Sequence, residues 1–543
     1  MAAEDKAKVS CKRANKRCIQ QITAPRLLIV WGKAKPPAPC KGEKKMKMLE
    51  LLRREANKAY TANGAVSNAS TMSDCLDLFA TAGALRNASD SEVVYRFIRA
   101  FAEDRDIAMK TLFYARDIRG GLGERRFFRV IMKFLAQNYP DVVIRNIDNI
   151  AEYGRYDDIL VLMDTACEKA AIAYIKAVLA DDMENMQAQG SVSLMAKWLP
   201  SVNASSKETV RIAKIIAKGM NMSEASYRKM LSSLRAYIKI LENNLRTKDY
   251  SFEYEKQPSK ALFKYRRAFI RNDEERYVSF IEKAKADPSV LKTSSLTPYD
   301  IVSKIIRTRR GFCYRAGSVG MPEEERNVLD ATWNALENYV NSDNTLVVVD
   351  GSGSMYGGWN VMPAAVAESL GIYFAERNKG AFKNNFITFS ANPKLVEIKG
   401  KDIVEKVQYC IGFNECSNTN IGRTFDLILN TALKNRLKQS DMPSRLIIIS
   451  DMEFDVCAED SSMTNFEAAK AKFARYGYTL PQLVFWNVNS FNRQQPVRKN
   501  EQGVTLVSGM SPQIFAMLKD DRMDPYTFMM SVIGAERYKQ IVA

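Results

Sequence analysis

The 543-residue chain contains no histidine. This absence excludes Ser-His-Asp and Cys-His catalytic units, and it excludes every zinc site that needs an imidazole ligand. Cysteine is sparse: the nine residues are scattered, none forms a CxxC pair, and their number is odd. This pattern favours free thiols in a reducing compartment over a disulfide framework or a zinc cluster.

Long apolar runs are also missing. No stretch of the sequence approaches the ~18 residues that a membrane-spanning helix needs. The run LLIVW at 27–31 is too short for the core of a signal peptide, and no small-residue cleavage site follows it. The sequence therefore predicts a cytoplasmic protein.

Acidic residues are fewer than basic ones, and half of the resulting positive charge lies near the N-terminus. The formal net charge is +18, and residues 1–45 carry twelve Lys or Arg against three Asp or Glu. A basic balance favours polyanionic partners. We expect residues 1–45 to be a disordered basic leader whose charge suits RNA. In the alternative, the segment is not translated: KGEKKM at 41–46 can be back-translated into a purine-rich ribosome-binding site, with the start at Met46 or Met48.

Residues 46–325 carry the spacing of amphipathic helices. Apolar residues recur every three or four positions, for example at 74–85, 93–104 and 125–137, and strand patterns are nearly absent. Short polar or glycine-rich segments separate these stripes. We expect a helical repeat domain, either a HEAT-like α-solenoid with divergent repeats or an irregular bundle.

Three basic segments of this helical half are candidate RNA-binding sites. RDIRGGLGERR at 116–126 places arginines around a glycine turn whose backbone amides could approach phosphate. AKWLPS at 196–201 precedes a helix with one basic side, and basic and aromatic residues alternate at 263–277, which suits stacking on RNA bases. The alternative for the first segment is a helix-turn-helix corner with solvated charges, and for the other two it is the ordinary surface of an amphipathic helix. The candidate residues are Arg116, Arg119, Arg125, Arg126, Lys197, Lys207, Arg211, Lys214 and Lys218.

Residues 326–543 alternate between strands and helices. Apolar runs at 345–350 and 445–451 predict two strands that are buried on both faces. The alternation predicts a doubly wound, Rossmann-like sheet that is parallel with one antiparallel edge. Further strands are expected at 385–390, 394–398, 482–488 and 504–509, and helices at 363–380, 421–435, 465–477 and 511–518.

Polar side chains stand where the two most apolar strands end. Asp350 ends one strand and opens DGSGS, so that Ser352 and Ser354 follow at alternate positions, and Asp451 ends the other. A polar loop between them contains Thr419, with Thr424 as an alternative. Sheets of this kind bind ligands at the carboxyl ends of their central strands. Carboxylate and hydroxyl oxygens suit Mg²⁺ or Mn²⁺, so these residues predict a metal site with one position open to a carboxylate of another protein.

Several motifs resemble known families. DGSGSM, TN and SDM resemble the metal-ion-dependent adhesion site (MIDAS) of von Willebrand factor A domains, over about 340–520. That resemblance implies metal ligands at Asp350, Ser352, Ser354, Thr419 and Asp451. A helical half followed by such a domain resembles the Ro autoantigen (TROVE) architecture, which implies a ring of helical repeats that binds structured RNAs and RNA ends. RDIRGGLGERR, AKWLPS and SDMEFD more closely resemble the domain of unknown function 2828 family of bacteria, phages and large viruses, for which no activity is implied.

Two functions are compatible with these features. The first is a non-catalytic, Ro-like ribonucleoprotein: the helical half binds structured or single-stranded RNA, and the von Willebrand A-like half binds a divalent metal and an acidic side chain of a partner. The second is a metal-dependent interaction or assembly scaffold of a phage or virus without RNA, in the host cytoplasm or associated with the virion. An enzyme is not expected, because the sequence lacks a GxxxxGK[ST] loop, a histidine base and a second metal cluster.

Overall fold

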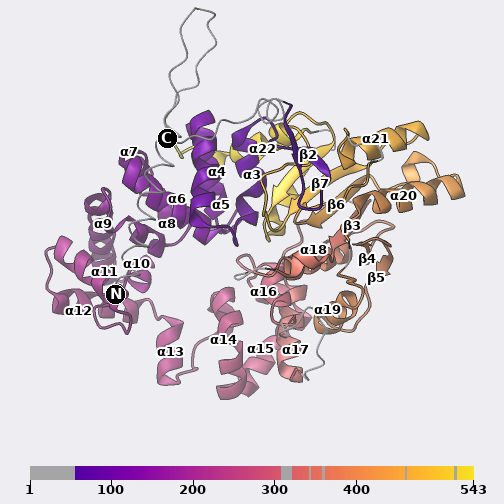
Figure 1. Ribbon diagram of the computed structural model, residues 1–543. Coiled ribbons are helices and arrows are strands. Elements are labelled where there is room, and N and C mark those ends of the chain that lie inside the picture. Colours follow the sequence, from indigo (N-terminus) through magenta and orange to yellow (C-terminus); the bar gives the residue numbers. More distant parts are fainter. Residues whose placement is uncertain are drawn as a thin grey trace, which may run out of the picture. The chain divides into compact units, whose positions relative to one another are not determined.

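The chain has a helical N-terminal part and a mixed sheet in its C-terminal part (Figure 1). The predicted basic leader at 1–45 lies outside the described residues, and residues 58–543 belong to one unit. The computed structural model describes residues 56–306, 321–340, 344–357, 361–416, 418–458, 462–518 and 523–543.

The helices of the N-terminal part begin where polar side chains cap them. The Ser73 hydroxyl accepts the backbone N–H of Leu76, and the Ser89 hydroxyl accepts that of Glu92, so both satisfy amides that a helix start leaves unpaired. Among the described residues, no helix combines the length and apolar character that crossing a membrane requires. The helices are α3 (Asp74–Thr81), α4 (Asp90–Glu103), α5 (Arg105–Arg116), α6 (Arg125–Asn138), α7 (Pro140–Arg145), α8 (Asn149–Tyr153), α9 (Glu168–Gln187), α10 (Met195–Trp198), α11 (Lys207–Gly219), α12 (Glu224–Tyr237), α13 (Leu241–Thr247), α14 (Ser259–Asn272), α15 (Glu274–Ala286), α16 (Pro298–Val302) and α17 (Glu323–Asn334).

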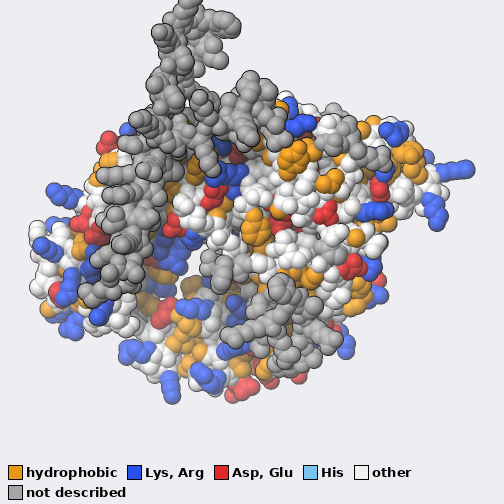
Figure 2. Space-filling view, viewed as in Figure 1, with side chains coloured by type: hydrophobic (Ala, Val, Ile, Leu, Met, Phe, Trp, Pro, Cys, Tyr) orange, Lys and Arg blue, Asp and Glu red, His pale blue; other side chains and the backbone are white. Residues whose placement is uncertain are grey.

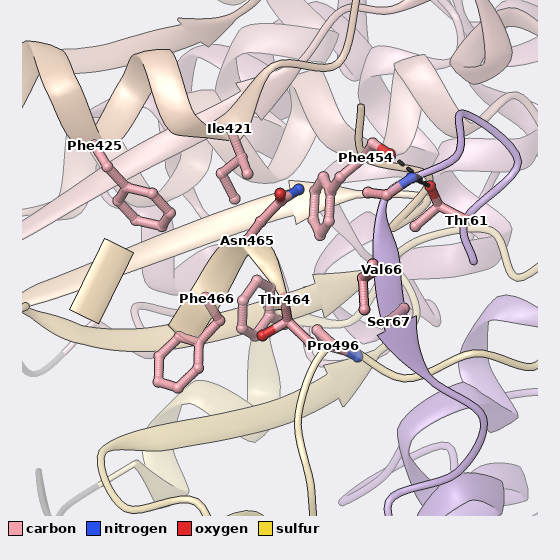
Figure 3. Close-up of a pocket in the computed structure, with 12 residues that line it drawn as sticks. Thr61, Val66, Ser67, Ile421, Phe425, Phe454, Thr464, Asn465, Phe466 and Pro496 are labelled. Carbon is pink, nitrogen blue, oxygen red and sulfur yellow. Dashed lines mark hydrogen bonds between the residues drawn. The ribbon is translucent and has the colours of Figure 1, made fainter. Parts of the chain in front are cut away.

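A short antiparallel hairpin precedes these helices, and the sequence analysis missed it. Its strands, β1 (Lys58–Tyr60) and β2 (Val66–Asn68), have three residues each, too few for an alternating pattern to stand out. The hairpin packs on the C-terminal half: the Thr61 hydroxyl donates to the Phe454 carbonyl at 2.6 Å. Figure 3 shows the apolar cavity beneath it, which Val66 of the hairpin lines together with Phe454 and Phe466.

The sheet of the C-terminal part is doubly wound, as predicted. Its strand order is β5-β4-β3-β6-β7-β8, and all neighbours are parallel except the edge pair β4 and β5. The predicted helix at 511–518 is a 3₁₀-helix over Pro512–Met517, and α19 and α22 were not predicted. The elements are β3 (Thr345–Asp350), α18 (Pro363–Arg377), β4 (Asn385–Phe389), β5 (Leu395–Glu397), α19 (Ile403–Ile411), α20 (Ile421–Asn435), β6 (Arg445–Ser450), α21 (Asn465–Arg475), β7 (Gln482–Asn487), β8 (Val504–Ser508) and α22 (Pro525–Ile533).

Helices cover both faces of this sheet. Successive side chains of a strand point to opposite faces, so β3 contributes to two cores. Val347 and Val349 share one apolar cluster with α18, whereas Leu346 and Val348 share the other with α20 and α21. This double coverage explains why β3 and β6 are buried at every position and read as continuous apolar runs in the sequence.

The expected boundary between residues 325 and 326 falls inside α17. This helix buries Val328 and Ala331 in one apolar cluster with α14 and α15. It also contacts α19 of the C-terminal part, where Arg326 is ion-paired with Asp402 at 2.6 Å. The helical part therefore continues to the end of α17, and β3 opens the α/β part.

The last residues of the chain return to the first helices. Helix α22 contacts α3 and α5, and beyond it the Tyr538 hydroxyl donates to Asp117 at 3.0 Å. The guanidinium of Arg537 also pairs with Asp117, whose side chain is fully buried. The first and last described residues thus both contact elements that are distant from them in sequence: the hairpin contacts the loop after β6, and the C-terminal residues contact the first helices.

Replacing Gly83 with alanine tests how closely the helical part packs on the sheet. An added Cβ would lie 2.6 Å from the Gly509 Cα, so backbone would have to move. We expect Gly83→Ala to destabilise the fold by about 1–3 kcal/mol, the usual cost of overpacking. Gly190→Ala is the matched control, because its nearest neighbour would be 3.5 Å away. Equal thermal midpoints for the two variants would contradict this account of the contact.

Candidate functional site

The ends of β3 and β6 bring two carboxylates to the same edge of the sheet. The strands pair in parallel, with Val349 opposite Ile449, so both chains leave the sheet on the same side. Asp350 and Asp451 are each 1% exposed. The hydroxyl of Ser450 donates to Asp350 Oδ2 at 2.6 Å and holds that carboxylate in place.

The DGSGS loop carries two hydroxyls to these carboxylates. The backbone N–H of Ser352 donates to Asp350 Oδ1 at 2.9 Å, and the Ser352 and Ser354 hydroxyl oxygens are 3.1 Å apart. The Ser354 side chain also lies close enough to the Asp451 carboxylate to influence its pKa. The structure thus brings together four of the five predicted metal ligands. Ser354 is exposed, so the cluster opens to solvent on that side.

Of the two loop glycines, only Gly351 is confined by the protein. A Cβ at Gly351 would lie 2.7 Å from Asn414 Oδ1, which explains the glycine. At Gly353 the nearest neighbour of an added Cβ would be 3.9 Å away. Packing within the protein therefore requires a glycine at position 351 but not at position 353.

The two carboxylates carry more negative charge than the surrounding protein compensates. Burial, together with the charge of Asp350, raises the pKa of Asp451 to about 7, and burial also raises the pKa of Asp350. Asp451 Oδ2 is buried and has no hydrogen-bond partner within the described part of the chain. A buried oxygen without a donor, beside a second carboxylate and two hydroxyls, fits a hard divalent cation such as Mg²⁺.

Thr419 occupies a different position from the other four predicted ligands. Its hydroxyl accepts Asn63 Nδ2 at 2.7 Å and lies 2.8 Å from the Glu453 carbonyl and 3.1 Å from Asp455 Oδ1. Asp455 lies between Thr419 and the cluster in the sense that it neighbours both. It is close to the Thr419 hydroxyl, and its charge raises the pKa of Asp350. The alternative, Thr424, lies within α20 with its hydroxyl buried and without a partner among the described residues.

The sequence analysis missed the residues that surround this cluster. Ser450, Glu453 and Asp455 all belong to the quoted SDMEFD run, so their proximity to Asp451 was available as a signal. Asn63 gave none, since it acts from the hairpin 356 residues before Thr419. The described residues contain no cluster of three or more Cys, Asp or Glu placed to hold a metal ion, so an ion bound between Asp350 and Asp451 would need hydroxyl ligands as well.

Arg116 is not available to contact RNA. It is 2% exposed and ion-paired with the fully buried Asp158 at 2.7 Å. The glycine turn after it does not present its amides either, because the N–H groups of Leu122, Gly123 and Glu124 donate to carbonyls of α5 and Asp117. The proposed phosphate turn is therefore a corner of the fold that closes on the preceding helix.

Most of the other basic candidates have acidic neighbours. The ion pairs are Arg119 with Glu152, Arg125 with Asp157, Arg126 with Asp90, Arg211 with Asp164 and Glu208, Lys214 with Glu224, and Lys197 with Glu242. Lys207 and Lys218 are exposed, and no carboxylate of the described chain lies within ion-pair distance of them. The aromatic residues Phe263, Phe269 and Tyr277 of the third basic segment are buried, so they cannot stack on RNA bases.

Comparison with known proteins assigns the chain to a family. The model of the domain of unknown function DUF2828 matches residues 61–179 and 171–346, more than half of the chain. The chain belongs to the DUF2828 family. A second model, the domain of unknown function DUF7788, matches residues 344–533 of this DUF2828 protein.

Two individual proteins are similar to this DUF2828 protein over most of its length. The uncharacterized protein L728 of Acanthamoeba polyphaga mimivirus is 27% identical over 520 residues, which cover 88% of this chain and 87% of that protein. The crystal structure of the Deinococcus radiodurans Ro (RSR) protein aligns with a TM-score of 0.33 and 12% identity, covering 86% of this chain and all of that one.

Replacing Asp451 with asparagine tests the uncompensated charge. In the metal-free protein at pH 8, we expect Asp451→Asn to raise the thermal midpoint, by the equivalent of about 1–3 kcal/mol, because one of two repelling buried carboxylates is removed. Asp181→Asn, at an exposed position of α9, is the control.

The difference in stability between the wild type and Asp451→Asn should also depend on pH. Because the pKa of Asp451 lies near 7, above the ordinary 3.8, the folded state binds more protons than the unfolded state between these values. The wild-type midpoint should therefore fall, relative to that of Asp451→Asn, as the pH rises from about 4 to 7. A constant difference across this window would refute the assignment.

Proposed function

We propose that this DUF2828 protein is a non-catalytic binding protein. Its α/β half holds Mg²⁺ or Mn²⁺ in a von Willebrand A-like adhesion site and, through the ion, a carboxylate of a protein partner. Its helical half binds RNA in a Ro-like manner.

One observation carries the metal part of this proposal. Asp350 and Asp451 lie buried side by side with the hydroxyls of Ser352 and Ser354, and Asp451 Oδ2 lacks a donor. The two carboxylates would neutralise a divalent ion, and the hydroxyls would add neutral oxygens. Thr419 would complete the set directly or through a bridging water, with Asp455 and Asn63 fixing its hydroxyl.

The openness of the cluster supports a role in binding another protein. Ser354 and Gly353 are exposed, whereas the carboxylates are buried, so an ion would be reachable from one side. A bound ion would supply positive charge and a free coordination position to an incoming anionic oxygen. The chain has no histidine to act as a general base beside it, which favours binding over catalysis.

A metal-dependent scaffold without RNA is the second candidate. It is favoured by the pairing of Arg119, Arg125 and most other basic candidates with carboxylates, which reduces the charge they offer to a polyanion. The two candidates share the metal site and differ in whether the helical half binds RNA. Separate experiments on the two halves of the function therefore distinguish them.

Metal addition tests the shared part. We expect Mg²⁺ to raise the thermal midpoint of the EDTA-treated protein, by the equivalent of about 2.7 kcal/mol at a hundredfold excess over Kd. Electron paramagnetic resonance should detect one bound Mn²⁺ per chain. Asp350→Asn should fold but lose both responses, and Asp181→Asn should retain them. A metal response that survives in Asp350→Asn would place the ion elsewhere.

Salt-dependent RNA retention tests the second part. We expect the full chain to bind RNA with an affinity that falls linearly with salt on logarithmic axes, because Lys and Arg side chains release counterions from phosphates. Filter binding at a series of salt concentrations measures this slope. A protein that responds to Mg²⁺ but retains no RNA at low salt would be the metal-dependent scaffold, which is the second candidate function.

A further inference from the structure

A polar groove without acidic residues lies on the helical half, between α12 and the loop after α10. Its lining includes Arg228, Lys229 and Arg235, together with the hydroxyls of Ser226 and Ser232. No carboxylate belongs to this lining. Arg228 and Lys229 are exposed, and within the described chain no Asp or Glu lies within ion-pair distance of either. The groove therefore differs from the basic candidates that the sequence indicated.

Arg235 is held in this groove by hydrogen bonds to neutral groups. Its guanidinium donates to the carbonyl oxygens of Ala196 and Leu199 at 2.8 and 2.7 Å, and to the Ser201 hydroxyl at 2.7 Å. These acceptors belong to the AKWLPS segment. The motif therefore has a structural role, which is to hold the Arg235 guanidinium. Because the acceptors are uncharged, the positive charge of Arg235 is not neutralised by them.

A second groove adjoins the first. The two share Ser201, and the second is lined by Trp198 and by Arg125 and Arg129, which are both ion-paired with Asp157 in the same groove. The guanidinium of Arg155 lies 4.1 Å from the centre of the Trp198 ring. Figure 2 shows Lys and Arg side chains gathered in a hollow of the helical half, near the place where Figure 1 shows α8 and α10.

We propose that these two adjoining grooves form one binding site for the phosphodiester backbone of single-stranded RNA, with Arg228, Lys229 and Arg235 as phosphate contacts. This proposal rests on the proposed RNA binding of the helical half and identifies where it occurs. Because two grooves meet at Ser201, the site is longer than a single phosphate requires. It therefore suits a linear polyanion.

The chemistry of the lining favours nucleic acid over an acidic peptide. Hydroxyl donors such as Ser226 and Ser232 suit phosphate and sugar oxygens, which receive most protein contacts to a nucleic acid backbone. The aromatic ring of Trp198 and the arginine planes in the adjoining groove suit bases, which stack on such surfaces irrespective of sequence. Polyglutamate, the acidic polypeptide used as competitor below, has no ring that would use this second feature.

The test compares two double variants of the full chain with equal changes in net charge. Arg228→Gln/Lys229→Gln removes two charges from the groove and, because both side chains are exposed on α12, should leave the thermal midpoint unchanged. Lys379→Gln/Lys383→Gln removes two exposed charges from the α/β half and serves as the control. The probe is a fluorescein-labelled single-stranded RNA of mixed sequence, measured by anisotropy at several salt concentrations, with polyglutamate as competitor.

We expect the groove variant to bind with a several-fold higher Kd. The slope of log K against log salt should also fall by about 1.4, which is about 0.7 for each lost phosphate contact on a single strand. The control should bind like wild type, and polyglutamate should displace RNA poorly. Equal binding by groove and control variants overturns the location, although RNA binding itself would stand.

Two other outcomes overturn the proposal in different ways. A wild-type chain that does not bind RNA refutes both the site and the RNA part of the proposed function, while the Mg²⁺ response tests the metal part independently. Polyglutamate that displaces RNA efficiently at matched charge shows that the groove takes acidic polypeptide, which also overturns the proposal.

Discussion

The parallel pairing of β3 with β6 is the constraint on which the candidate metal centre depends. Both strands are buried at every position, so their register is determined by the two apolar layers that cover them. Parallel strands end at the same edge, and this places Asp350 beside Ser450 and Asp451, 100 residues later in the chain. The burial of two repelling carboxylates is unfavourable by itself, and the hydrophobic packing of the sheet compensates it.

The helical and α/β halves are joined more closely than two family models suggest. The DUF2828 and DUF7788 matches meet at residues 344–346, yet one apolar cluster includes Phe79 and Leu112 of the helices and Val347 and Phe374 of the sheet region. The hairpin at the start contacts the loop after β6, and the C-terminal tail pairs with Asp117. The two halves therefore share part of one apolar core.

Arginine serves two purposes in the helical half, and sequence alone does not distinguish them. Arg116 is neutralised by a buried carboxylate and supports the fold. Loss of one partner of such a deeply buried ion pair would leave an uncompensated charge and strongly destabilise the protein. Arg235 is equally well anchored, but by carbonyl and hydroxyl oxygens that leave its charge uncompensated. The difference lies in the partners, which come from segments about 35 to 40 residues away.

The sequence by itself determined the class of each half and indicated four side chains that the structure brings together in the candidate metal site. Apolar periodicity reports helices and doubly buried strands because it records which faces must avoid water, and Asp350 and Asp451 followed from where two such strands end. Only the tertiary structure decided the surroundings: the contact of Asn63 with Thr419, the burial of Arg116 and the seat of Arg235. These depend on pairing between distant segments, and a local pattern contains no information about which partner a polar side chain will meet.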